Sequence, residues 1–216
     1  MFGNIKNWLL NILFPAQELP ENLRLNDTLF CSVCRARLPE NKKVCHKNAQ
    51  YILGAAVRYD DRVKEMIWHL KYRNRYTLAE PLSNLLNTYI ENCKLEIGNF
   101  VIVPIPLSEK RFRDRGYNQA TLIAKYVSEK FGLPVIENAL IRQQHSAPQA
   151  EIRGWDERKK NIAGCFGILR PELVEGRNII LMDDVFTSGA TISEAAHQLK
   201  DFGAKKIIGL VIAKAG

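Results

Sequence analysis

The sequence lacks any apolar run long enough to cross a lipid bilayer. Its N-terminal apolar stretch is interrupted by Asn11, ends at Pro15 and has no small-residue cleavage site, so it does not fit a secretory signal peptide. Apolar residues between positions 2 and 12 recur at helical spacing, which predicts a short amphipathic helix docked on the protein. We therefore expect a cytoplasmic protein with no stable membrane insertion.

Two common nucleotide-binding signatures are also missing. The chain has no G-x-x-x-x-G-K-[ST] loop of the P-loop type and no G-x-G-x-x-G dinucleotide fingerprint. No internal repeat or low-complexity tract is present either. Any nucleotide-like ligand must therefore be held by a different kind of site.

Cysteine is scarce, and its five copies do not fit a framework of paired disulfides. Cys31 and Cys34 form a C-x-x-C pair and Cys45 follows, whereas Cys93 and Cys165 stand alone. This spacing is typical of a reducing compartment and of a metal site. We expect the two isolated cysteines to be thiols of the core.

The composition is that of a globular protein with an excess of positive charge. Hydrophobic residues make up 46% and charged residues 25% of the 216 positions, enough for one substantial core. The 31 Lys and Arg residues outnumber 23 Asp and Glu residues, giving a net charge of +8. Such a balance favours anionic partners such as nucleotides, phosphosugars or nucleic acid.

The most informative stretch is 179–191. Ile179–Met182 is a short apolar run typical of a buried parallel strand, and Asp183 and Asp184 follow at its carboxyl end, where open α/β sheets bind ligands. A small, hydroxyl-rich turn comes next and leads into a helix, so its backbone N–H groups can hold a phosphate. Its residues are Thr187, Ser188, Gly189, Ala190 and Thr191. Acids for sugar hydroxyls beside a phosphate cradle predict a ribose 5-phosphate site. The alternative, a capped helix with no ligand, leaves two acids after a buried strand without a partner, which is costly.

Alternating strands and helices predict an α/β fold with a parallel sheet. We expect a small Cys-containing N-terminal segment over 1–50 and one larger domain over 51–216. The predicted strands cover 52–59, 100–105, 179–182 and 207–212, with a brief strand at 135–136. The predicted helices cover 61–72, 79–90, 118–131 and 192 to about 203.

A proline-rich and basic segment follows the strand predicted at 100–105. Arginine binds phosphate oxygens through two parallel hydrogen bonds, so a loop rich in arginine is suited to grip a pyrophosphate. The alternative is a solvated basic surface loop. The candidate pyrophosphate residues are Pro104, Ile105, Pro106, Leu107, Arg111 and Arg115.

Residues 142–161 are polar and without periodicity, which predicts a long mobile loop. Such loops often act as lids, and this one would bring positive charge over a departing pyrophosphate. The alternative is a surface excursion with no role at the site. The candidate residues of this loop are Gln149, Arg153, Arg158 and Asn161.

Taken together, these segments resemble a known family. The stretch 179–191 resembles the phosphoribosyl pyrophosphate (PRPP) motif of type I phosphoribosyltransferases. With the segments at 104–119 and 149–161, the chain resembles the competence-associated ComF family from about residue 30 onward. The resemblance implies a type I phosphoribosyltransferase fold behind a zinc-ribbon-like segment.

The zinc ligands depart from the family pattern. ComF proteins usually carry two C-x-x-C pairs, but here the second pair has only Cys45, since position 48 is Asn. The adjacent His46 is the candidate fourth ligand beside Cys31 and Cys34, although consecutive ligands strain tetrahedral geometry. A metal-free knuckle and a three-ligand site completed elsewhere are the alternatives.

Two functions follow from the resemblance. In the first, the chain binds PRPP with Mg²⁺ as a phosphoribosyltransferase: Asp183 and Asp184 face the ribose hydroxyls, the turn 187–191 holds the 5′-phosphate, and a nitrogen nucleophile replaces pyrophosphate. In the second, the chain is a non-catalytic competence module that binds single-stranded DNA or a protein such as a ComF-operon helicase. The sequence specifies neither the nucleophile nor the oligomeric state.

Overall fold

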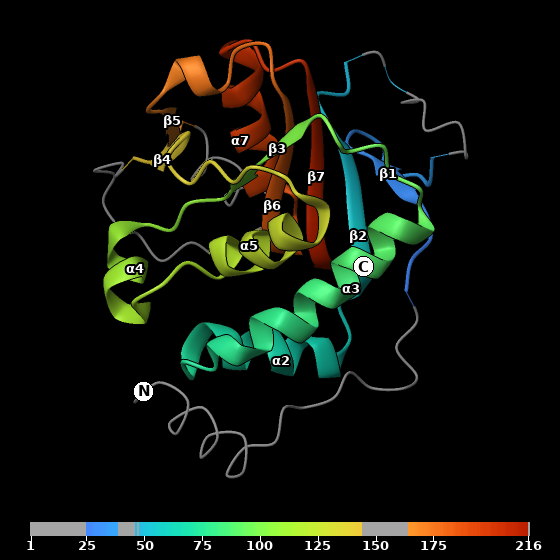
Figure 1. The fold of residues 1–216 in the computed structure, drawn as a ribbon, viewed down its shortest axis with the longest axis vertical. Helices are drawn as coiled ribbons and strands as arrows, with labels where there is room; N and C mark the ends of the chain where they lie inside the picture. Colours follow the sequence, from blue (N-terminus) through green and yellow to red (C-terminus); the bar gives the residue numbers. More distant parts are fainter. Residues whose placement is uncertain (1–24, 39–45, 47, 144–163, 216) are drawn as a thin grey trace.

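The protein is built around a five-stranded sheet with the order β1-β2-β7-β6-β3 (Figure 1). The structure is a computed structural model and describes residues 25–38, 46, 48–143 and 164–215. Four strands are parallel, and only β1 at the edge runs antiparallel to its neighbour. The strands are β1 (Leu29–Cys31), β2 (Ile52–Arg58), β3 (Phe100–Pro104), β6 (Asn178–Phe186) and β7 (Lys206–Lys214).

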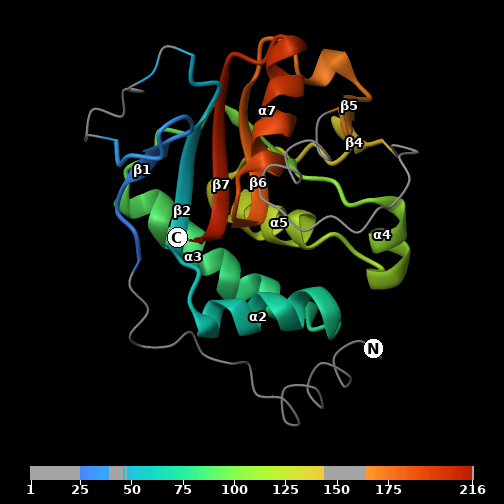
Figure 2. The same ribbon diagram turned by 180° about the vertical axis from the view of Figure 1, so that it is seen from behind.

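Helices cover both faces of this sheet (Figures 1 and 2). Helices α2 (Asp61–Tyr72), α3 (Ala79–Asn92) and α5 (Gln119–Phe131) lie on one face, and α7 (Ala190–Asp201) lies on the other. The remaining elements are short. They are α4 (Glu109–Arg115), the antiparallel pair β4 (Leu140–Arg142) and β5 (Phe166–Ile168), and two 3₁₀ turns at Tyr76–Leu78 and Pro171–Leu173.

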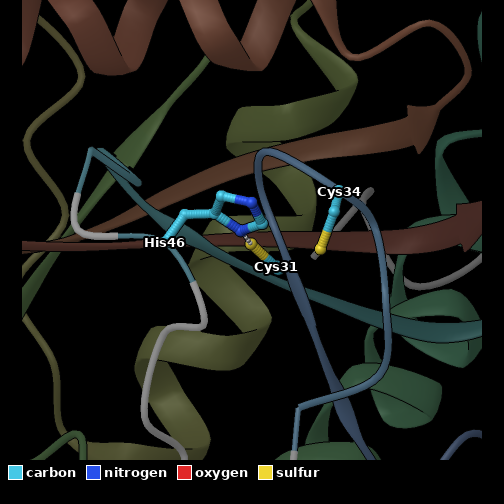
Figure 3. Close-up of side chains that lie close together, drawn as sticks. All are labelled: Cys31, Cys34 and His46. Carbon is cyan, nitrogen blue, oxygen red and sulfur yellow. Dashed lines mark hydrogen bonds between the residues drawn. The ribbon is translucent and has the colours of Figure 1, made fainter.

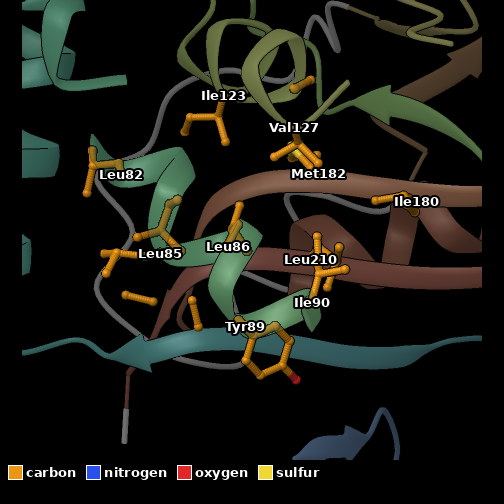
Figure 4. Close-up of a cluster of buried hydrophobic side chains, with 14 of the residues drawn as sticks. Leu82, Leu85, Leu86, Tyr89, Ile90, Ile123, Val127, Ile180, Met182 and Leu210 are labelled. Atoms are coloured by element: carbon orange, nitrogen blue, oxygen red, sulfur yellow. The ribbon is translucent and has the colours of Figure 1, made fainter. Parts of the chain in front are cut away.

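The central strands β6 and β7 divide the hydrophobic core into two clusters. Because successive side chains of a strand point to opposite faces, Ile180, Met182 and Leu210 meet α3 and α5 (Figure 4), whereas Ile179 and Leu181 meet α7. Strands buried on both faces need continuous apolar runs, which explains why the sequence of β6 does not alternate.

Capping residues explain where the predicted helices begin and end. The Asp60 carboxylate accepts the backbone N–H of Val63 at 2.9 Å and caps α2, and the Asn118 side chain caps α5 in the same way. Helix α5 ends at Gly132 in the left-handed conformation that favours glycine. The α/β class, the parallel sheet and the four long helices are confirmed.

Three predicted features differ from the structure. The basic loop after β3 is in part a helix: Ser108 caps α4 and Gly116, with φ of 77°, ends it. The brief strand at 135–136 is only an isolated bridge between Val135 and Ile102. Strand β6 continues past Met182 and contains both aspartates, since Asp183–Phe186 keep pairing with β7.

Two predicted segments lie outside the described residues, namely the N-terminal helix between positions 2 and 12 and most of the loop at 142–161. The Cys-containing segment is partly described, and β1 joins it to the main sheet through pairing with β2. Within the described part of the chain, no helix combines the length and apolarity that a membrane span requires. The isolated thiols Cys93 and Cys165 are buried, as predicted.

Candidate functional site

The two aspartates lie near the carboxyl end of β6 and point to opposite faces of the sheet. Asp184 shares the face of Met182 and is only 2% exposed, whereas Asp183 is on the α7 side and is partly exposed. The Asp183 carboxylate accepts the backbone N–H of Asp184 at 2.8 Å. The two carboxylates are therefore near each other without being side by side.

Lys71, in the last turn of α2, holds the buried aspartate. Its Nζ atom lies 2.6 Å from Oδ1 of Asp184. The other carboxylate oxygen, Oδ2, is buried and has no hydrogen-bond partner among the described residues. A buried acceptor is costly when unsatisfied, so this oxygen suits a hydroxyl group or a hydrated cation.

Asp183 has an unusual proton affinity. Burial, followed by the negative charge of Asp184, raises its pKa from the ordinary value of 3.8 to about 7, although the positive charges of Lys71 and Arg142 act in the opposite direction. Such a carboxyl group changes its charge near neutral pH. Perturbed acids of this kind cluster at functional sites.

This shift makes stability depend on pH, with a sign that can be tested. Between about pH 4 and pH 7 the folded protein holds a proton on Asp183 that the unfolded chain has lost, so stability decreases as pH rises through this range. We expect D183N to flatten this slope. The stability of D183N relative to wild type should therefore rise by about 2–3 kcal/mol between pH 5 and pH 8, at about 1.4 kcal/mol for each pH unit up to the raised pKa. Urea unfolding at several pH values measures it. The variant D114N, at an exposed carboxyl on α4, is the control, and identical slopes for D183N and wild type would contradict the assignment.

The turn 187–191 leads from β6 into α7. Gly189 has φ of 80°, and a Cβ atom there would lie 2.4 Å from Cζ of Phe186, which packs beneath the turn. The backbone N–H of Ser193 donates to the Gly189 carbonyl at 2.9 Å, which continues the first helical turn. The turn is thus tight and lies at the positive end of a 12-residue helix, where the helix dipole favours an anion.

The segment after β3 is fastened to the same end of the sheet. The backbone N–H of Ile105 donates to the Met182 carbonyl at 2.9 Å, and the Asn118 side chain donates to the Ile105 carbonyl at 2.9 Å. The Tyr117 hydroxyl donates to the carbonyl of Leu70, directly before Lys71. These bonds bring Pro104–Leu107 next to β6 and the end of α2.

The two arginines predicted for this segment have different surroundings. Arg115 donates to the Gln119 side chain and lies over the Tyr72 ring, with its Cζ atom 5.4 Å from the ring centroid. Arg111 is exposed on α4. A cavity of about 560 Å³ lies beside this segment, lined in part by Leu107, Phe112 and Tyr117.

The predicted loop residues Gln149, Arg153, Arg158 and Asn161 lie outside the described part of the chain. Strands β4 and β5 flank this loop, and Arg142 at the end of β4 lies over the Phe166 ring, 5.4 Å from its centroid. Sequence reasoning overlooked Arg142 as a charge that acts on Asp183, and it also overlooked the pairing of Lys71. The sequence signals for Lys71 were its place in the basic stretch 58–75 and in the stretch Leu70–Tyr72, which adds to the resemblance to the ComF family.

A separate cluster of candidate metal ligands lies beside β1 (Figure 3). Side-chain atoms of Cys31, Cys34 and His46 all lie within 4.8 Å of one another, and Sγ of Cys31 is 3.6 Å from Nδ1 of His46. Tetrahedral zinc with Zn–S distances of 2.3 Å separates its ligand atoms by roughly 3.5–4 Å, so these three residues fit a zinc ion after a small adjustment. Cys45, the other predicted ligand, lies outside the described residues.

Comparison with known proteins agrees with this arrangement. Residues 114–216 match the family described as "Phosphoribosyl transferase domain". One solved structure, an allosteric regulatory enzyme of purine biosynthesis, superimposes with a TM-score of 0.43 and 16% identity over 66% of this chain and 29% of its own. That likeness is too distant to carry an argument.

Three curated relatives are more informative. The chain is 28% identical to Competence protein F of Haemophilus influenzae, 29% identical to Competence protein ComFC of Bacillus subtilis and 30% identical to DNA utilization protein YhgH of Escherichia coli. The matches cover 69%, 80% and 69% of this chain and 66%, 65% and 66% of these relatives, just under two thirds of their length. Residues 114–216, which include β6 and β7, match a phosphoribosyltransferase domain, and the chain belongs to the ComF family.

Proposed function

We propose that the chain binds PRPP together with Mg²⁺ at the carboxyl end of β6 and acts as a phosphoribosyltransferase-type protein in DNA uptake. The observation that carries the proposal is the buried Oδ2 atom of Asp184, which is unsatisfied among the described residues and belongs to a carboxylate held by Lys71. A tight turn at the positive end of α7 follows three residues after Asp184. The relatives named for competence and DNA utilization support the link to DNA uptake.

Different residues bind different parts of the ligand. Ionised Asp183 and Asp184 accept hydrogen bonds from the ribose hydroxyls, and the N–H groups of the turn 187–191 hold the 5′-phosphate. Arg115 and the backbone of Pro104–Leu107 lie on the side that receives the pyrophosphate. Mg²⁺, when bound beside Asp184, would supply positive charge that stabilises the departing pyrophosphate.

Group transfer at this site requires one bond to break and one to form. The bond between ribose C1 and a pyrophosphate oxygen breaks, the pyrophosphate leaves with the electron pair, and a nitrogen nucleophile bonds to C1. Positive charge develops on the sugar ring as the bond breaks. The carboxylates of β6 stabilise this charge because they are fixed before the reaction begins.

Calorimetric titration with PRPP, with and without Mg²⁺, tests the proposal. We expect binding by wild type, a loss of affinity of about tenfold or more in D183N and D184N, and no change in D114N, because each aspartate contributes charge-assisted hydrogen bonds of about 1.5–3 kcal/mol. Affinity for D184N should fall without loss of the folded state, which circular dichroism checks. Absence of PRPP binding by folded wild-type protein would overturn the proposal.

For the cluster at Cys31, Cys34 and His46 we propose a structural zinc ion. The support is the convergence of two sulfur atoms, from the hairpin at the sheet edge, with one imidazole nitrogen of His46, which follows the hairpin in sequence. When bound, zinc would join the two ends of this hairpin region and so restrict its unfolding. The zinc content of purified protein measures occupancy.

A second candidate function, binding of single-stranded DNA, rests on aromatic side chains beside the end of α2. Trp68 and Tyr72 are 43% and 64% exposed, and their ring centroids are 6.0 Å apart. Arg73 lies over the Trp68 ring at 5.0 Å and Arg115 over the Tyr72 ring at 5.4 Å. Exposed rings with adjacent guanidinium groups suit base stacking next to phosphate contacts.

We expect W68A to weaken binding of a fluorescent oligothymidine about tenfold, because each stacked base contributes about 1–3 kcal/mol. Fluorescence anisotropy at several salt concentrations measures the affinity and its salt dependence. Phe202, a 40% exposed ring at the end of α7, provides the control variant F202A. Equal losses in both variants, or an affinity independent of salt, would count against this surface.

A further inference from the structure

The turn that carries Cys31 and Cys34, here called the cysteine turn, also contacts the turn 187–191, here called the phosphate turn. Arg35, the residue after Cys34, donates a hydrogen bond from Nη2 to the backbone carbonyl of Ser188, although the two residues are 153 positions apart. Its guanidinium also lies over the Phe186 ring, with Cζ 5.4 Å from the ring centroid. Arg35 therefore holds the turn 187–191 in two ways: through the Ser188 carbonyl and through the Phe186 ring on which the turn packs.

The bond to Ser188 controls the direction of a neighbouring N–H group. The carbonyl of Ser188 and the N–H of Gly189 belong to one planar peptide unit and point in opposite directions. Holding the carbonyl on the Arg35 side therefore turns the Gly189 N–H away from Arg35. Because Gly189 has the permissive backbone of glycine, with φ of 80°, this peptide unit has few local restraints of its own.

The position of Arg35 depends on the conformation of the cysteine turn. Its backbone has φ of 60°, which is uncommon for a residue with a side chain, and its N–H donates to the Cys31 carbonyl at 2.9 Å. The N–H of Cys31 in turn donates to the Ala36 carbonyl at 3.0 Å. A metal ion held by Cys31 and Cys34 would fix residues 31–34. These residues directly precede Arg35, so the metal would also fix the direction of its guanidinium group.

A second contact joins the residue before β2 to the first turn of α7. The Tyr51 hydroxyl lies 3.0 Å from Oγ of Ser193, in the first turn of α7. Tyr51 is buried and precedes β2, the strand that pairs with β1. The start of α7 is thus held by Tyr51, and the turn before it is held by Arg35.

We propose that Arg35 is a positioning residue for the phosphate turn, and that metal binding at Cys31, Cys34 and His46 orders this turn through Arg35. The inference rests on the proposed ribose-phosphate site. It assigns the N-terminal hairpin a direct role there: loss of metal releases Arg35, the Ser188 peptide unit gains freedom, and affinity for a phosphate group falls.

Hydrogen exchange of the ligand-free protein, read by NMR at the amides of Ala190 and Ser193, tests the coupling without any ligand. These amides donate to Oγ of Ser188 and to the Gly189 carbonyl. We expect R35A to speed exchange of these amides about tenfold, the effect of losing one charge-assisted hydrogen bond, and amides of β7 to be unchanged. Removal of zinc by a chelator should reproduce the pattern in wild type but add nothing in R35A. Arg37, exposed on the same hairpin, provides the control R37A.

Titration with ribose 5-phosphate distinguishes failure of this inference from failure of the proposed function. If wild type binds the sugar phosphate, R35A should bind about tenfold more weakly and R35K should recover part of the loss, because lysine keeps the charge but not the planar fork. Unchanged exchange at the amides of Ala190 and Ser193 in R35A would overturn the inference even if PRPP binds. Faster exchange in R35A with no sugar-phosphate binding by wild type would support the coupling and overturn the proposed function.

Discussion

Replacement of Lys71 by Met is expected to lower the free energy of unfolding by about 3 kcal/mol. The substitution leaves Asp184 in place, 2% exposed, with no positive charge at its Oδ1 atom. Breaking one partner of a buried ion pair costs about 3–5 kcal/mol, and the lower end applies because the Lys71 side chain is 22% exposed. Urea unfolding measures the change.

The chain offers a matched control for K71M. Lys125 lies 3.0 Å from Glu137, but both side chains are at least half exposed, so K125M should change stability by less than about 0.5 kcal/mol. The double variant K71M/D184N removes both charges and should regain much of the loss. Equal effects of K71M and K125M would mean that the pair behaves as an ordinary surface contact, and Lys71 would then have no special role in holding Asp184.

Substitution of Gly189 by Ala should have a comparable effect and should also abolish ligand binding at the turn. The new Cβ atom would lie 2.4 Å and 2.7 Å from two ring atoms of Phe186, which is itself 2% exposed and has little room to move. Overpacking costs about 1–3 kcal/mol, and the positive φ adds roughly 1 kcal/mol for a residue with a side chain. We expect a total loss of about 2–4 kcal/mol.

Gly176 separates these two contributions. It has φ of 70°, and nothing lies within 4 Å of the Cβ position, so G176A reports the backbone strain alone. The difference between G189A and G176A is therefore the steric cost at Phe186. A companion variant, G189A/F186L, should recover part of the stability because leucine vacates the space of the ring. If G189A and G176A unfold at the same urea concentration, the packing of Phe186 under the turn adds no steric cost to the substitution of Gly189.

Most of the sheet and its long helices could be predicted from the sequence, because the signals for them are local. Asp60 and Asn118 mark helix starts, Gly132 marks a helix end, and the apolar run 179–182 marks a buried strand. Helix α4 was missed because seven residues with no buried side chain have no amphipathic pattern, although Ser108 and Gly116 are ordinary capping signals.

The site was predictable in part, for a related reason. The aspartates and the turn after them are consecutive in sequence, so their motif is visible there. Lys71 is 113 residues away from Asp184, and Arg35 is 153 residues away from Ser188. No periodicity or spacing reports such contacts, since they exist only once the sheet has formed. The two carboxylates point to opposite faces of the sheet because β6 extends past Met182. The apolar run 179–182 did not predict this extension.

The order of strands in the sheet has a consequence for synthesis. Strand β7 lies between β2 and β6, and Ile52 pairs with Ile208, so the centre of the sheet is made by the last strand along the described chain. Until β7 has left the ribosome, β2 and β6 have no partner between them, so their unpaired backbone edges and their apolar side chains stay exposed. Pairing between distant segments is slow. The nascent chain therefore passes through an aggregation-prone interval, and substitutions in β7 should reduce the yield of soluble protein more than equally buried substitutions in α3.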